Sequence, residues 1–390
     1  MISRVSLNER VHEWRLREDV IEKDYVLGWI LWGIGSEPAL REQWVFKGGT
    51  CLKKCYIETY RFSEDLDFTV LEDGPLATDD VRPVLRELLD RVNQASGIDF
   101  AVEAPRLRLR PGRRAAEGRV YYIGPRGTPG PASVKLDLDG EERVFRETEW
   151  RPIAHSYDDA LPEPATVQCY SFVEVFAEKL RAMGERGRPR DLYDIINLFR
   201  RVDLRPEPAA LRSLLGEKCE RTGVPFPTHE SLYGSDTRAE LESEWQNMLA
   251  HQLPQLPPLA GFWSELRNLF DWLEGVAAPR ALSLIPSVGV ATTDWNPPST
   301  MRTWGGNAVE LLRFAAQNRL IVEFDYIDER GRLSRRRVEP YSLRQTTEGN
   351  IVLGVFDLHR EAPRSIRIDR IRNPRVSSEP FELRYATEIG

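Results

Sequence analysis

The sequence predicts an α+β protein: a mixed sheet with helices, then a helical lobe, then a small β-barrel or sandwich. Helix-like and strand-like patterns alternate in the first part, helical spacing dominates residues 170–272, and short strand patterns crowd residues 319–371. At roughly 150 residues per domain, 390 residues suit two or three domains. We expect four segments, namely a core at 1–165, a helical lobe at 166–275, a linker at 276–304 and a barrel domain at 305–390.

The composition excludes several classes of protein. Hydrophobic residues make up 41% and charged residues 29%, which is ordinary for a globular chain and excludes a disordered protein or a coiled-coil rod. A formal net charge of −7 argues against a dedicated nucleic-acid coat. Apolar runs are far shorter than the roughly 20 residues of a membrane helix, and the N-terminus is too charged for a signal peptide. We therefore expect a cytoplasmic protein without membrane contact.

The first part of the chain supplies the elements of the mixed sheet. Helical spacing of apolar side chains predicts helices at residues 20–34 and 81–96. The segment WVFKGGTCLKKCY, residues 44–56, predicts a short strand, a glycine turn and a helix. Alternation of apolar and polar side chains predicts a strand in residues 61–70, and the arginine-rich residues 106–120 pair with residues 133–140 as a hairpin.

The remainder divides at a proline-rich stretch. Residues 275–300 contain four prolines and only two charged side chains, which indicates a linker because proline continues neither a helix nor a central strand. A short helix is expected from Asn307, followed by strands that predict a small barrel or sandwich.

Two acidic side chains form the strongest functional pattern. Asp65 and Asp67 are two residues apart on a predicted strand, so both carboxylates point to one face while Leu66 and Phe68 point to the other. Such a pair suits Mg²⁺, whose octahedron phosphate oxygens would complete. The Gly48–Gly49 turn in FKGGT lets backbone N–H groups approach a phosphate, and the helix that opens near Thr50 adds its N-terminal end. The alternative is an exposed strand with two solvated acids.

Two further clusters accompany this pair. In VKLDLDG, Asp137 shares a strand face with Lys135 and could bind a second metal or take a proton, or it lies on a solvated hairpin edge. In residues 172–199, Lys179 or Arg186 would contact a triphosphate with Asp194 orienting one of them. The alternative there is a capped helix pair with surface ion pairs.

The basic segment and the cysteines complete the candidates. The arginines of residues 106–120 are expected to guide RNA through phosphate contacts; those proposed are Arg106, Arg108, Arg110, Arg113 and Arg114. Cys51 and Cys55 are four residues apart, but zinc would need two more ligands, so packing of reduced thiols is the better interpretation.

GGT, the Asp65–Asp67 pair, the third strand carboxylate and the EKLRA…R…RDLYD block together resemble the AbiEii/AbiGii nucleotidyltransferase toxin family. IEKDYVL also resembles that family's N-terminal helix, and the likeness covers roughly residues 1–275. It implies a DNA polymerase β-like fold and kinship with MenT-type toxins, which add nucleotides to tRNA 3′ ends. By resemblance Ser63, Asp65 and Asp67 match the core motif, Lys179 and Asp194 match the later one, and Asp137 matches the third carboxylate.

The C-terminal strands resemble a WYL domain through RRRVEPYSLR, GNIVLGVFD and RSIRIDRI, although the Trp–Tyr–Leu triplet appears as Ile-Val-Leu at residues 351–353. The resemblance implies a small SH3-like or Sm-like β-barrel that senses a nucleotide or oligonucleotide. Tyr341 would stack on a base, and four arginines would bind phosphate, namely Arg344, Arg364, Arg367 and Arg370. The alternative is a structural barrel with a solvated arginine face.

Together these features predict a metal-dependent nucleotidyltransferase that moves NMP from an NTP to an RNA acceptor, with the tRNA 3′ end expected, as a toxin in phage defence by abortive infection. Mg²⁺ or Mn²⁺ would bind Asp65, Asp67 and Asp137. The nucleotide would contact Lys47, Gly48, Gly49, Thr50, Ser63, Lys179 and Arg186. The alternatives are a non-catalytic nucleotide or nucleic-acid sensor and NMP transfer to a protein side chain; a cognate antitoxin is a candidate partner.

Overall fold

A computed structural model describes residues 1–57, 60–233, 235–276, 282–286, 291–292 and 308–389. The chain divides into two compact units, Met1–Val175 and Phe176–Gly390. Most of the predicted linker, residues 276–304, lies outside the described residues, and the four predicted segment boundaries stay predictions. No helix among the described residues is long and apolar enough to cross a membrane.

The first unit combines helices with one mixed sheet, as the sequence predicts. Its helical elements are α1 (Arg4–Trp14), α2 (Glu18–Ser36), α3 (Gly48–Cys51), the π-helical turn η1 (Leu52–Tyr56) and α4 (Thr78–Ser96). Its strands are β1 (Trp44–Lys47), β2 (Asp65–Val70), β3 (Arg106–Leu109), β4 (Ala115–Tyr122), β5 (Ala132–Asp139), β6 (Glu149–Pro152) and β7 (Thr166–Cys169).

The strand order of this sheet is β3-β4-β5-β2-β1-β7-β6. The pairs β2–β5 and β1–β7 are parallel, whereas the other neighbouring pairs are antiparallel. The two parallel pairs join segments far apart in the sequence. They bring β5 beside the acidic strand β2, and the end of β7 beside the strand that leads into the glycine turn.

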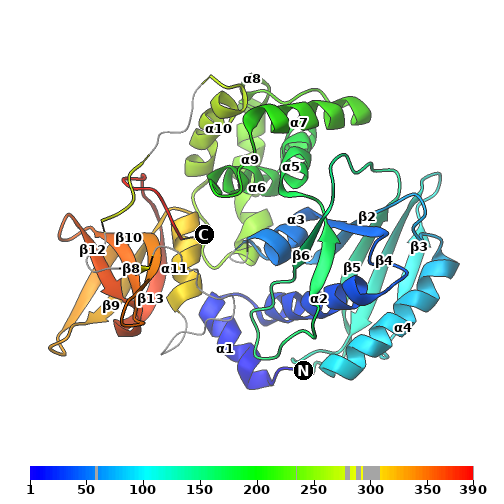
Figure 1. Cartoon of the computed structure of the whole chain (residues 1–390), viewed down its shortest axis with the longest axis horizontal. Coiled ribbons are helices and arrows are strands. Elements are labelled where there is room, and N and C mark those ends of the chain that lie inside the picture. The colour runs from blue at the N-terminus through cyan, green and yellow to red at the C-terminus, as the bar shows by residue number, and fades with distance from the viewer. Residues whose placement is uncertain (58–59, 234, 277–281, 287–290, 293–307, 390) are drawn as a thin grey trace. The chain divides into compact units, whose positions relative to one another are not determined.

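Helices α2 and α4 pack against each other and against the sheet (Figure 1). Helix α4 is amphipathic, with Leu85, Leu88 and Val92 buried, and ends at Gly97, whose φ of +75° closes the helix as a left-handed C-cap. Helix α2 is buried along most of its length. A Cβ at its Gly33 would lie 2.7 Å from the Val92 side chain, so a glycine allows the close approach.

The second unit begins with the predicted run of helices. These are α5 (Phe172–Arg186, which starts in the first unit), α6 (Pro189–Arg200), α7 (Pro208–Thr222), α8 (His229–Leu232), α9 (Ser235–Leu249), the 3₁₀ turn η2 (Ala250–Gln252) and α10 (Leu259–Leu273). Both α6 and α7 begin with proline, which suits a first helical position because no intrahelical N–H bond is lost there. Helix α6 packs on α9 and α10, and Tyr193 stacks on Phe262 with ring centroids 5.2 Å apart.

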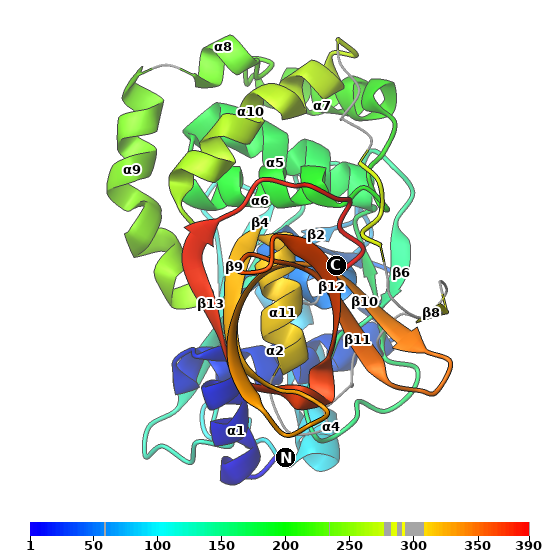
Figure 2. The ribbon, with the colours of Figure 1, turned by 90° about the vertical axis from the view of Figure 1, so that its left-hand side faces the viewer.

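The last part of this unit is a small antiparallel β domain. It contains β8 (Ala291–Thr292), α11 (Ala308–Gln317), β9 (Leu320–Ile327), β10 (Leu333–Thr346), β11 (Ile351–Asp357), β12 (Ala362–Arg367), the 3₁₀ turn η3 (Ile368–Arg370) and β13 (Ile371–Pro380). The strand order is β12-β11-β10-β9-β13, with β8 on β10. The sheet curls, and α11 packs against β9, β10 and β13 across its opening (Figure 2).

A buried charge cluster joins the helices of the second unit to the β domain. Glu265 of α10 forms ion pairs with Arg200 of α6 at 2.5 Å and with Arg319, between α11 and β9, at 2.8 Å. Arg200 also donates to the carbonyl oxygen of Gln317 at 3.1 Å. Burial alone would raise the pKa of Glu265, but the two guanidinium groups outweigh it and lower the pKa. The cluster therefore holds a carboxylate with two cations.

Candidate active site

The predicted acidic face is present on β2. Asp65 and Asp67 are partly exposed, whereas Leu66 and Phe68 between and after them are buried. The parallel register of β2 and β5 places Asp137 opposite Asp67, and Lys135 opposite Asp65. Two strands thus present three carboxylates on adjacent register positions, and the apolar face beneath them fixes both strands in the core.

Cations already lie among these carboxylates. The Lys135 Nζ is 2.5 Å from one Asp137 carboxylate oxygen, and the Arg110 Nη2 is 2.6 Å from the other. Burial raises the pKa of Asp65; Lys135 opposes this shift, while Glu64 and Asp137 add to it. Burial is the main cause of this rise in pKa. The three carboxylates form an all-oxygen donor set, which fits a hard divalent cation such as Mg²⁺ or Mn²⁺.

The glycine turn rests directly on this face. Gly48 has a φ of +82°, which is the left-handed region that glycine adopts at low cost, and a Cβ there would collide with the Asp67 carboxylate. A Cβ at Gly49 would lie 2.8 Å from the Arg61 guanidinium and 3.1 Å from the Ser63 hydroxyl. The strand–turn–helix interpretation is confirmed, and both glycines are needed for close approach.

The side chains that flank the turn have structural partners. Lys47 forms an ion pair with Glu142, which also accepts a hydrogen bond from the Tyr170 hydroxyl at 3.0 Å. Thr50 is buried, and its hydroxyl donates to the carbonyl oxygen of Asp65 at 2.5 Å. In this structure the Thr50 side chain therefore ties α3 to the start of β2, and a contact of Thr50 with the nucleotide stays a prediction.

Two cations near the acidic face had no role in the sequence interpretation. Lys23 of α2 forms an ion pair with Glu64 at 2.5 Å and, with Lys135, opposes the rise in the pKa of Asp65. Arg61 is almost completely buried beside Gly49. Arg61 begins the predicted strand segment, residues 61–70, just before the acidic pair, and this position is a signal that could have identified it. Lys23 is 41 residues from Glu64, and only the fold brings the two together.

The remaining predicted site residues belong to the helices of the second unit. The Lys179 Nζ is 2.8 Å from the Asp194 carboxylate, and Asp194 is completely buried. Asp194 thus pairs with Lys179, and the role of this pair in orienting a cation on the triphosphate stays a prediction. Arg186 instead makes two hydrogen bonds of 2.8 Å to Asp191, whose carboxylate is also buried.

Two protein families match this chain, one over the first part and one over the β domain. The family described as the nucleotidyl transferase AbiEii toxin of type IV toxin–antitoxin systems matches residues 29–274, more than half of the chain. The chain belongs to the AbiEii nucleotidyltransferase toxin family. It is therefore a nucleotidyltransferase, and the predicted resemblance is confirmed. The WYL domain family matches residues 307–376, so the β domain is a WYL domain.

One solved structure agrees with this assignment of the fold. MenT4, a nucleotidyltransferase toxin from Mycobacterium tuberculosis, superposes with a TM-score of 0.52 at 18% identity, over 71% of this chain and 91% of that protein. The proteasome accessory factor PafBC of Arthrobacter aurescens matches 32% of this chain and 18% of its own, at 17% identity and a TM-score of 0.19. The first likeness supports the mixed α+β fold of the AbiEii part.

The arginine-rich hairpin of this AbiEii protein, formed by β3 and β4, contains arginines that bond to other protein groups and an exposed arginine. Arg114 donates to the carbonyl oxygens of Gly140, Leu71 and Glu72 at 2.7–2.8 Å, so it holds two loops together. Of the others, Arg110 pairs with Asp137, Arg113 pairs with Glu141, and Arg106 pairs with Glu103. Arg108 is exposed and forms no hydrogen bond or ion pair with other described residues.

The predicted stacking role of Tyr341 in the WYL domain is wrong. Tyr341 is completely buried with Ile321 and Phe381, and its hydroxyl donates to Glu339 at 2.7 Å. A β-bulge between Pro340 and Ser342 interrupts the alternation of β10 and turns this ring inward.

Of the four WYL arginines, three have acidic partners: Arg344 pairs with Glu388, Arg367 with Asp369 and Arg370 with Glu329. Arg364 is exposed, and no hydrogen bond or ion pair links its side chain to the described part of the chain.

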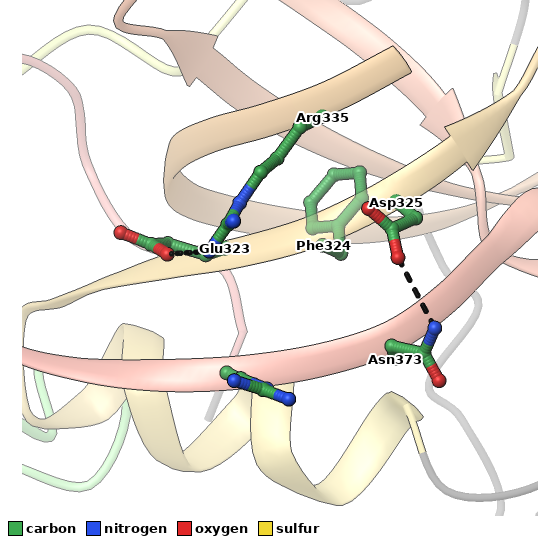
Figure 3. Close-up of a pocket in the computed structure, with 6 residues that line it drawn as sticks. Glu323, Phe324, Asp325, Arg335 and Asn373 are labelled. Atoms are coloured by element: carbon green, nitrogen blue, oxygen red, sulfur yellow. Dashed lines mark hydrogen bonds and ion pairs between the residues drawn. The ribbon is translucent and has the colours of Figure 1, made fainter. Parts of the chain in front are cut away.

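A pocket elsewhere in the WYL domain contains none of the predicted ligand residues. It is lined by Glu323, Phe324, Asp325, Arg335, Asn373 and Arg375 (Figure 3). Arg335 pairs with Glu323 at 2.9 Å and Asn373 donates to Asp325 at 3.1 Å across it. Its volume of about 120 Å³ is far below the roughly 300–1,000 Å³ of ligand pockets, so it would not enclose a nucleotide.

Proposed function

We propose that this AbiEii protein transfers NMP from an NTP to an RNA acceptor, most simply the 3′ end of a tRNA, and that this activity makes it toxic during phage infection. The observation that supports the site is the register of β2 and β5, which places Asp137 opposite Asp67 and beside Asp65. These are the residues to which we assign the divalent metal. When bound there, Mg²⁺ or Mn²⁺ would lower the pKa of the acceptor hydroxyl and stabilise the leaving pyrophosphate.

The protein's own groups would bind and orient the nucleotide. The Gly48–Gly49 backbone can approach the phosphates because neither residue has a side chain, and the Ser63 hydroxyl lies beside this turn. We assign Lys179 to neutralising charge that develops on the phosphates, with Asp194 holding its ammonium group. Arg186 is a second candidate cation, positioned by Asp191. Lys47, paired with Glu142, is assigned to the same phosphate-binding region.

In the proposed reaction, the 3′-hydroxyl oxygen of the acceptor bonds to the α-phosphorus. The bond from the α-phosphorus to its bridging oxygen breaks, pyrophosphate leaves, and the hydroxyl proton passes through a base to solvent. Both oxygens of Asp137 accept hydrogen bonds from Lys135 and Arg110. We assign Asp137 to holding the metal, and it is also the candidate to accept this proton; either role uses an oxygen lone pair beside these two cations.

RNA contact is proposed for the exposed arginines of the hairpin, above all Arg108. Each phosphate contact contributes about 0.7–0.9 to the slope of log affinity against log salt. Arg108→Ala should therefore weaken tRNA binding and reduce that slope by about 0.7–0.9, whereas Arg212→Ala, an exposed arginine on α7, should not. An affinity for tRNA that does not change with salt would remove RNA from the proposal.

An incorporation assay tests the proposal directly. Purified protein, Mg²⁺, each labelled NTP in turn and total cellular RNA are incubated and resolved on a gel. We expect label at tRNA size that is lost in Asp65→Asn and Asp67→Asn and kept in Asp73→Asn, an exposed acid just after β2. Label on protein would instead show transfer to a side chain. Absence of label from RNA and protein would favour a non-catalytic sensor.

Toxicity and partners are tested in cells. Expression should arrest growth, and Asp67→Asn should abolish the arrest while Asp73→Asn keeps it. A cognate antitoxin is the proposed partner, and a nucleotide or oligonucleotide is the proposed ligand of the WYL domain, with Arg364 as its exposed contact. Unchanged toxicity of Asp67→Asn would separate the toxic effect from nucleotidyl transfer.

A further inference from the structure

Three of the four cysteines meet behind the glycine turn. Cys51 ends α3, Cys55 lies in the π-helical turn η1, and Cys169 ends β7. Their sulfur atoms all lie within 4.8 Å of one another, and all three residues are buried. Cys169 is more than 110 residues from the other two. The parallel pairing of β1 and β7, which places Cys169 opposite Phe46, brings it to the helix that follows the turn.

The surroundings of this thiol cluster favour one thiolate, on Cys169. Hydrogen bonds from the Cys51 and Cys55 thiols lower the pKa of Cys169 well below its usual range, whereas burial raises the pKa of Cys51 and Cys55. The Arg151 guanidinium lies close by: its Nε donates to the carbonyl oxygen of Cys55 at 3.2 Å. The positive charge of Arg151 favours the ionised form of both Cys55 and Cys169.

We propose that Cys51, Cys55 and Cys169 form a binding site for a soft, thiophilic cation of low coordination number, with Cu⁺ as its representative. Three sulfur ligands select soft ions over Mg²⁺ or Ca²⁺. The site is distinct from the acidic face of β2, and its occupation does not depend on nucleotidyl transfer.

The number of ligands separates Cu⁺ from Zn²⁺. Structural zinc is almost always four-coordinate, and catalytic zinc completes three protein ligands with water. Within the described residues, no histidine or acidic side chain joins the three cysteines. Their burial also leaves little access for a water ligand. A cation that is satisfied by three thiolates fits this site better than one that needs a fourth ligand.

Binding would link α3, η1 and β7 through one ion. Because Cys51 follows the Gly48–Gly49–Thr50 turn directly, the ion would restrain the turn from behind. The burial of the cluster means that the ion should enter while the chain folds. The experiment therefore supplies the metal during synthesis of the full chain.

The full-length protein is produced in copper-supplemented medium, purified without oxygen and dialysed against a Cu⁺ chelator. We expect one copper per chain, an ultraviolet sulfur-to-copper charge-transfer band, and three sulfur neighbours by X-ray absorption. Cys169→Ala should lose the copper and the band. Cys219→Ala, which removes the buried cysteine of α7, should keep both.

Several results would overturn the proposal. These are the absence of retained copper in the wild-type protein, equal retention in Cys169→Ala, or retention of Zn²⁺ in place of Cu⁺ when both metals are supplied. A disulfide among the three cysteines in the oxygen-free protein, detected by mass spectrometry, would also exclude the site. Cys169→Ala could lose copper because it unfolds, so circular dichroism checks the fold of each variant. The number of sulfur neighbours in the wild-type protein tests the site without any variant.

Discussion

Gly48 offers a sharp test of the link between the glycine turn and the acidic face. Alanine at this position would keep a φ near +82°, which costs an L-residue roughly 1–2 kcal/mol. Alanine also lowers the conformational entropy of the unfolded chain relative to glycine, which stabilises the folded state by about 0.4–1 kcal/mol. The balance is a loss of about 1 kcal/mol before any contact is counted. The new Cβ also collides with the Asp67 carboxylate.

The collision can be resolved in two ways. If the turn and Asp67 both stay, overpacking adds about 1–3 kcal/mol to the loss of stability. If the Asp67 carboxylate turns away, stability is spared and divalent-metal binding is lost. Gly97→Ala is the matched control in the same unit. Its φ is +75°, and the nearest atom to a Cβ there is Met1 Cβ at 3.6 Å, an ordinary contact.

Both variants are measured by urea unfolding and by Mn²⁺ titration followed by electron paramagnetic resonance. We expect Gly48→Ala to lose either 1–3 kcal/mol more stability than Gly97→Ala or at least tenfold in Mn²⁺ affinity, with nucleotidyl transfer lost in both cases. A Gly48→Ala protein that matches Gly97→Ala in stability and retains wild-type Mn²⁺ binding and transfer would refute the reasoning.

Three other perturbations have defined outcomes. Asp24→Asn leaves the Lys54 ammonium, 2% exposed and 2.8 Å from the lost carboxylate, buried without its partner, and urea unfolding should show a loss of roughly 3–5 kcal/mol. Burial raises the pKa of Asp65, so as pH falls this residue should protonate above the ordinary value of about 3.9. As Asp65 protonates, Mn²⁺ affinity should fall while the contribution of Asp65 to folding stability rises. A pH midpoint for the loss of Mn²⁺ affinity at or below the ordinary pKa contradicts this. Glu265→Ala leaves Arg200 and Arg319 facing each other, and hydrogen exchange should accelerate in α10 and α11; unchanged exchange would mean that the cluster does not hold them.

Local patterns predicted the acidic strand well. Alternation in residues 65–68 identifies both the buried face and the carboxylate face, because the period of a strand is two, whereas Thr69, expected on the carboxylate face, is buried. The sequence could not predict that Asp137 lies opposite Asp67, since strand pairing and register are decided by packing between distant segments. The same limit applies to Cys169, which has no spacing relation to Cys51.

Tyr341 shows a different reason for failure. An aromatic residue in an arginine-rich strand resembles a base-stacking platform if the alternation of β10 continues unbroken. The bulge at residues 340–342 breaks it, and residues 338–343 are buried without interruption. A bulge has no reliable sequence pattern. The sequence therefore cannot predict which face of the sheet the residues after a bulge occupy, even when the strand itself is correctly predicted.

The ammonium group of Lys135 gives the acidic face a means of discriminating between cations. Lys135 already supplies one positive charge to Asp137. Sodium or potassium would exchange one unit charge for another and would lose the hydrogen bond that the ammonium donates, so neither gains by entering. A divalent ion brings a second charge that the lysine lacks. We therefore expect the concentrated monovalent salts of the cell to leave this face to the ammonium group until a doubly charged ion arrives.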